Sequence, residues 1–90
     1  MRAKFEIGEL VVTPQAESHL TPRELARAIA RHTDGDWGLV PPEDKDSNDA
    51  SVVKGEGTLH SAYRSLAGVS FWVVTEADRS VTTVLMPDDY

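Results

Sequence analysis

Three apolar runs in the second half of the chain constrain its fold more than any other feature. Residues 58–64 (TLHSAYR) and 80–86 (SVTTVLM) alternate with a period of two, which is typical of strands that bury one face. Residues 69–75 (VSFWVVT) are almost continuously apolar, which favours a central strand buried on both faces. The connections at 65–68 and 77–80 are short and polar. Together these runs predict neighbouring antiparallel strands.

Two further elements are predicted in the first third of the chain. Residues 4–12 (KFEIGELVV) have an imperfect period of two and indicate another strand, with a bulge or a close backbone approach at Gly8. Residues 21–32 (TPRELARAIARH) predict a helix, because Thr21 and Glu24 can form a capping box and a proline suits the first helical position. An apolar stripe follows at Leu25, Ala28 and Ile29.

The middle of the chain is acidic and its local structure is left open. The net charge is −6 overall and −5 over residues 34–56. Within 41–54, paired prolines suit a helix start and Gly55 suits a helix end, but the apolar periodicity is poor. Helix and loop therefore both remain possible for 41–54.

The simplest architecture that buries these stripes is an α+β fold. We expect a single small domain over residues 1–90, with a three- or four-stranded antiparallel sheet and one main helix packed on one face. No apolar run approaches the roughly 20 residues that span a bilayer, and the first residues lack the apolar segment of a secretory signal. We therefore expect a cytoplasmic protein that contacts no membrane.

Several kinds of chemistry are excluded or disfavoured by composition. The chain has no cysteine, so it has no disulfide, thiol nucleophile or thiolate metal site. His19, His32 and His60 are too widely spaced for a local metal motif, and residues 44–55 begin like a calcium loop but lack its glycine and its final glutamate. We expect no metal and no cofactor. An acidic chain without a visible basic cluster also disfavours direct nucleic-acid binding.

One set of residues suits catalysis on a phosphodiester. His60 and Arg64 share a face of their strand, and with Glu76 they would supply an acid or base, a phosphate clamp and a second carboxylate. The competing interpretation is a polar sheet face in water, which we favour. Ser61 cannot be activated by its neighbour His60, because adjacent strand residues point to opposite faces.

The candidate binding residues lie in two connections. Trp37, beside Asp36 in the turn GDWG, can fold back into the core or stay exposed as an anchor for a partner, and the core alternative is favoured. Glu76, Asp78 and Arg79 form a charged tip between two strands, which is either a recognition site or ordinary turn chemistry.

Four segments resemble a group of small bacterial proteins found on plasmids and other mobile elements. The segments are GELVVTPQA (8–16), GDWG (35–38), SAYR (61–64) and the whole of 71–90. Members of this group commonly carry labels such as "plasmid-related protein" or "type I restriction endonuclease subunit". The resemblance implies an association with mobile-element or restriction systems, and no particular activity.

We therefore expect a small acidic protein without catalytic activity, an accessory or interaction protein whose partner is another protein. In a narrower form of this hypothesis, the carboxylates of residues 34–56 imitate nucleic-acid phosphates toward a defence complex. The alternative is a ribonuclease-like phosphodiesterase that uses His60, Arg64 and Glu76.

Overall fold

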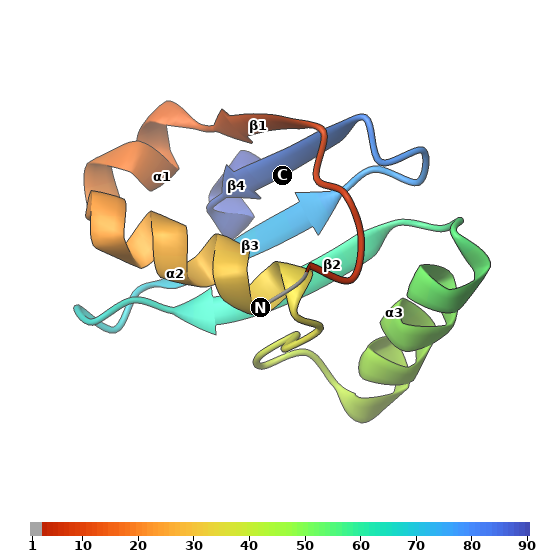
Figure 1. Cartoon of the computed structure of the whole chain (residues 1–90). Coiled ribbons are helices and arrows are strands. Elements are labelled where there is room, and N and C mark those ends of the chain that lie inside the picture. Colours follow the sequence, from red (N-terminus) through yellow and green to blue (C-terminus); the bar gives the residue numbers. More distant parts are fainter. Residues whose placement is uncertain (1–2) are drawn as a thin grey trace.

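The computed structural model describes residues 3–90 and contains a four-stranded open sheet with three helices (Figure 1). The strands are β1 (Glu9–Val12), β2 (Leu59–Arg64), β3 (Ser70–Thr75) and β4 (Val81–Leu85). The helices are α1 (Pro14–His19), α2 (Pro22–Thr33) and α3 (Pro42–Lys54), and a 3-10 turn, η1 (Pro87–Asp89), follows β4. The predicted α+β class is confirmed. Within the described part of the chain, no helix has the length and apolar character needed to cross a bilayer.

The second half of the chain forms the expected antiparallel sheet. β2 pairs with β3 and β3 pairs with β4, both antiparallel, so β3 is flanked on each side. Phe71, Val73, Val74 and Thr75 of β3 are all buried, which explains its unbroken apolar run.

The first strand differs from the prediction, because β1 joins the sheet parallel to β4, which makes the sheet mixed. β1 also begins only at Glu9, since Gly8 has a φ of +62° and turns the backbone out of the strand direction. Upstream of that turn, the N–H of Lys4 donates to the carbonyl of Thr33 at the end of α2. Parallel strands need a long crossover, and here nearly the whole chain supplies it.

Helix α2 packs on one face of the sheet and begins as predicted (Figure 1). The Thr21 hydroxyl accepts from the Glu24 N–H, and the Glu24 carboxylate accepts from the Thr21 N–H, which completes the capping box. The second carboxylate oxygen of Glu24 accepts from the N–H of Leu66 in the β2–β3 connection, at 2.8 Å. One side chain thus fixes both the start of the helix and a turn of the sheet.

Residues 42–54 are helical, so the structure decides between the two alternatives left open for this segment. α3 starts with proline at its first position and ends at Gly55, which adopts the left-handed conformation with φ +73°. Its only buried residue is Asn48. α3 is therefore a second long helix beside the edge strand β2, where the sequence predicted one main helix.

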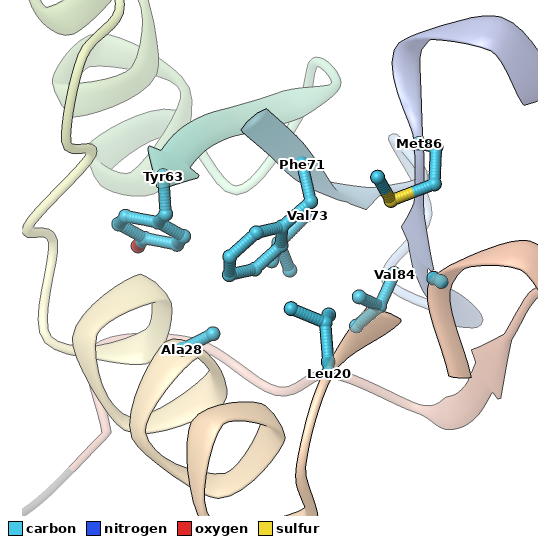
Figure 2. Packing of buried hydrophobic residues seen from close by; sticks show 8 residues of the cluster. Leu20, Ala28, Tyr63, Phe71, Val73, Val84 and Met86 are labelled. Carbon is cyan, nitrogen blue, oxygen red and sulfur yellow. The ribbon is translucent and has the colours of Figure 1, made fainter. Parts of the chain in front are cut away.

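The main core lies between α1, α2 and the sheet (Figure 2). Leu20 and Ala28 approach from the helical side. Opposite them, the sheet contributes Tyr63, Phe71, Val73 and Val84, and Met86 follows directly after β4. Burying one such large apolar side chain stabilises the fold by about 1.5–3 kcal/mol.

A smaller cluster joins α3 and its preceding turn to β2. It consists of Trp37, Val40 and Leu59, and the ring of Phe5 stacks on the Trp37 indole with 6.0 Å between centroids. Trp37 is only 3% exposed, as the core alternative predicts.

Candidate functional site

The charged tip between β3 and β4 is occupied by contacts within the chain. Arg79 Nη1 donates to the carbonyls of Gly57 and Ala77, at 2.6 and 3.0 Å, and its Nη2 donates to the carbonyl of Ser51 at 3.1 Å. The Asp78 carboxylate accepts from the N–H and the hydroxyl of Ser80, and these bonds lower the pKa of Asp78. Arg79 is therefore a brace between the tip and α3.

Asp36 and Trp37 are also engaged inside the protein. The Asp36 carboxylate pairs with the Arg31 guanidinium at 2.8 Å and 3.3 Å. The Trp37 indole N–H donates to the Asp49 carboxylate at 2.9 Å. These two residues hold the turn before α3 in place, and the buried indole cannot serve as an exposed anchor.

The proposed catalytic trio does not converge. In the register of β2 and β3, Arg64 is opposite Ser70, and Thr75 is opposite Leu59 at the other end of the pair. Glu76 follows Thr75, so about six strand residues, or roughly 20 Å, separate the rows of Arg64 and Glu76. One side chain cannot bridge that gap.

His60 lies near the start of β2 and packs against an aromatic ring. Its imidazole meets the Trp72 indole edge to face at 4.7 Å, and its Nε2 has no hydrogen-bond partner among residues 3–90. Burial lowers the pKa of His60, and the carboxylate of Asp44 partly opposes that effect. His60 thus takes part in packing on the face of the sheet opposite α2.

A buried polar network was not anticipated. His32, in the last turn of α2, points inward and is fully buried. Its Nδ1 lies 2.6 Å from the Ser61 hydroxyl and its Nε2 lies 2.9 Å from the Thr75 hydroxyl. Thr75 in turn bonds to the hydroxyl of Thr82, which donates to the carbonyl of Ile7. Burial lowers the pKa of His32 to about 4, so the ring is neutral at pH 7.

A serine hydroxyl bonded to a neutral histidine is the pairing that activates nucleophiles in hydrolases. Here both Ser61 and His32 are 0% exposed. A substrate has no access to either atom, so the network connects α2 to the sheet and is structural. The sequence contains no local signal for it, since the two residues lie 29 positions apart.

The edge of the sheet at β2 is closed by two segments. The backbone N–H and carbonyl of His60 bond to the side-chain amide of Asn48, at 3.2 and 2.8 Å. The N–H of Ala62 donates to the carbonyl of Trp37, and the carbonyl of Ala62 accepts from the N–H of Leu39. An edge covered in this way has few free groups with which to pair with another strand.

The opposite edge, at β1, is open. The N–H groups of Glu9 and Thr13 donate toward β4, so the alternate residues Leu10 and Val12 turn their N–H and carbonyl groups outward. Nothing in residues 3–90 bonds to these outward groups. The Leu10 side chain is 46% exposed. A shallow groove of about 420 Å³ lies beside β1, lined by Leu10, Val12, Leu25, Ala26, Ile29 and Val84.

These features define a small α+β domain with one closed and one open sheet edge. Comparisons of the chain with protein-family models, with curated proteins and with solved structures found no match. The association with mobile-element or restriction systems therefore stays a prediction. Within the described residues, no group of three or more histidine, aspartate or glutamate side chains is placed to hold a metal ion.

Proposed function

We propose that the protein is a small non-catalytic binding domain that takes up an extended segment of another protein along β1. The observation that carries this proposal is the difference between the two edges of the sheet. β2 is covered by Asn48 and by residues 37–39, whereas the outward groups of Leu10 and Val12 are left without partners in residues 3–90. Strand addition at an open edge is a common mode of peptide recognition.

The groove beside β1 supplies the second requirement of strand addition, a place for side chains. In an added strand, every second side chain would point to the face of the sheet that carries α2. On that face the groove offers the apolar side chains of Leu10, Leu25 and Ile29. The partner is therefore an extended segment with apolar residues at alternate positions.

This proposal agrees with the expectation of an interaction protein, but it places the binding surface at β1 and not at the two connections that the sequence suggested. The tip residues Asp78 and Arg79 are used within the chain, and His60, Arg64 and Glu76 do not form a common site. The three residues proposed for a ribonuclease-like activity therefore do not come together, and this geometry does not support that activity. The exposed carboxylates of α3 remain available to a basic partner. The hypothesis that the carboxylates of residues 34–56 imitate nucleic-acid phosphates therefore stays a prediction.

The test is a selection of peptides from a random library on the full chain, followed by hydrogen exchange measured by NMR. The selected peptides should slow exchange at the amides of Leu10 and Val12 by at least about tenfold, because a paired amide is protected. Binders that protect neither amide would contradict the proposal. Self-association of the free protein that protects these amides would instead make a second copy the occupant of β1.

Variants at Leu10 separate strand addition from other modes of binding. Leu10→Pro removes an outward N–H and the Leu10 side chain but no bond to β4, so it should abolish binding while the fold, checked by circular dichroism, persists. Leu10→Lys should act in the same way by placing a charge at the edge. Val53→Lys is the matched control, because Val53 is an exposed apolar residue of α3, far along the chain from β1. Equal losses from both lysine variants would overturn the assignment to β1.

A further inference from the structure

A second pocket lies on the other side of α2, between this helix and the turn that joins β2 to β3. Its volume is about 100 Å³. Three arginines line it, although the sequence showed no basic cluster: Arg27 and Arg31 come from successive turns of α2, and Arg64 comes from the end of β2. A chain with a net charge of −6 thus has three of its arginine residues along one cavity.

Arg31 is held in a fixed position. Its guanidinium bonds twice to the Asp36 carboxylate and lies over the ring of Tyr63, with 4.4 Å between its central carbon and the ring centroid. The Tyr63 hydroxyl donates to the Asp36 carbonyl at 2.6 Å, which fixes the ring as well. Only two of the five N–H groups of Arg31 are used by Asp36.

Arg27 and Arg64 are both exposed, and within residues 3–90 neither forms an ion pair or a side-chain hydrogen bond. One carboxylate, that of Glu24, also lines the pocket. Its two oxygens already accept from the N–H groups of Thr21 and Leu66, which lower its pKa. The two free guanidinium groups therefore outnumber the single lining carboxylate.

The floor of the pocket is apolar, since Ala28, Tyr63 and Phe71 line it and each is at most 3% exposed. Leu66, which is 95% exposed, lies at the rim. A volume of about 100 Å³ is enough for one small oxyanion. Guanidinium groups bind carboxylates and phosphates in a planar, two-bonded geometry.

We propose that this pocket binds a carboxylate or phosphate group carried on an apolar stem, with Arg27 and Arg64 as the binding groups and Arg31 as the fixed wall. The site is separate from the groove beside β1, and its function does not depend on strand addition there. Such a group occurs on small organic acids and phosphates, and at the C-terminus of a peptide that ends in an apolar residue.

The test is an NMR titration of the full chain with four probes: inorganic phosphate, benzoate, a tetrapeptide that ends in phenylalanine, and the same peptide amidated at its C-terminus. At least one anionic probe should shift the side-chain N–H signals of Arg27 and Arg64 in a saturable way. Tighter binding of the free-acid peptide than of the small anions would assign the ligand to a peptide end, and the reverse order to a small molecule. No saturable shift with any probe would overturn the proposal.

Substitutions identify the binding groups. Arg27→Gln and Arg64→Gln should each weaken binding of the best probe by roughly 10- to 100-fold, which is the effect of a lost hydrogen bond to a charged group. Arg23→Gln is the matched control, because it makes the same change in charge on the same helix at a residue that does not line the pocket. If Arg23→Gln weakens binding as much as the other two, the attraction is a general charge effect and the pocket is not an anion-binding site.

Discussion

Nδ1 of His32 and the hydroxyl oxygen of Ser61 lie 2.6 Å apart in the interior of the protein, and this contact connects the last turn of α2 to the edge strand β2. It shows that a serine and a histidine at hydrogen-bond distance can be a structural pair. The decisive fact is burial, because both residues have no exposed surface.

The first prediction concerns the pH dependence of stability. Burial lowers the pKa of His32 to about 4 in the folded protein, whereas the unfolded value is about 6.5. Between these pH values the unfolded chain binds the proton and the folded chain does not, so stability is complete above about pH 6.5 and falls as the pH approaches 4. The total loss is about 3 kcal/mol in the free energy of unfolding.

Urea unfolding at pH 7, 6 and 5 measures this loss, and His32→Gln should reduce the slope. His60 contributes with the same sign, because burial lowers its pKa too, so the difference between the variant and the parent protein isolates His32. Identical slopes in the two proteins would show that His32 does not cause the effect.

The second prediction concerns Asn48, the buried residue of α3. Asn48→Ala removes both bonds to the backbone of His60 and leaves its N–H and carbonyl unpaired. We expect a loss of about 1–3 kcal/mol in the free energy of unfolding, with faster amide exchange at His60 and along α3. Ser47→Ala, at the exposed neighbouring position, is the control and should change neither quantity.

The third prediction separates the two contributions of Arg79 to the tip. This residue has a φ of +62°, which costs about 1 kcal/mol for any residue with a side chain, and its guanidinium contacts outweigh that cost. Arg79→Ala loses the contacts and keeps the strain, so it should lower the free energy of unfolding by about 2 kcal/mol. Arg79→Gly should be about 1 kcal/mol less harmful. A stable Arg79→Ala protein that lost its partner would instead make the tip a recognition site.

The fourth prediction uses two glycines with similar backbone angles. Gly38 and Gly68 have φ values of +76° and +84°, but a Cβ at Gly38 would lie 2.1 Å from the carbonyl oxygen of Ala62, whereas a Cβ at Gly68 would meet nothing within 4 Å. Thermal unfolding should show a clearly larger loss for Gly38→Ala than for Gly68→Ala. Equal losses would mean that the backbone angle alone matters and that the close approach to β2 is unimportant.

The features that the sequence predicted correctly depend on neighbouring residues. The capping box of Thr21 and Glu24 spans three positions, and the antiparallel strands are joined by short connections, so local chemistry determines both. α3 was ambiguous for the opposite reason. Asn48, Asp49 and the Ser51 carbonyl attach it to the rest of the protein by hydrogen bonds, and a helix held largely in this way needs no regular apolar stripe.

The features that the sequence did not predict depend on residues far apart in the chain. The parallel pairing of β1, the pairing of His32 with Ser61, and the gathering of Arg27 and Arg31 around Arg64 all bring distant segments together. A partial signal existed for the arginine pocket. Arg27 and Arg31 are four positions apart on one helix, so they share a face. The sequence did not indicate that Arg64, at the end of a strand, would lie beside them.

The parallel pairing of β1 has a consequence for how the protein is made. Among the strands of residues 3–90, β4 alone pairs with β1, and the hydroxyl of Thr82 in β4 reaches the carbonyl of Ile7, which lies 75 residues earlier. During translation the strands β2, β3 and β4 can pair in sequence as each one emerges. β1, synthesised first, has no neighbour until β4 has left the ribosome, so throughout that interval it is an unpaired strand accessible to chaperones.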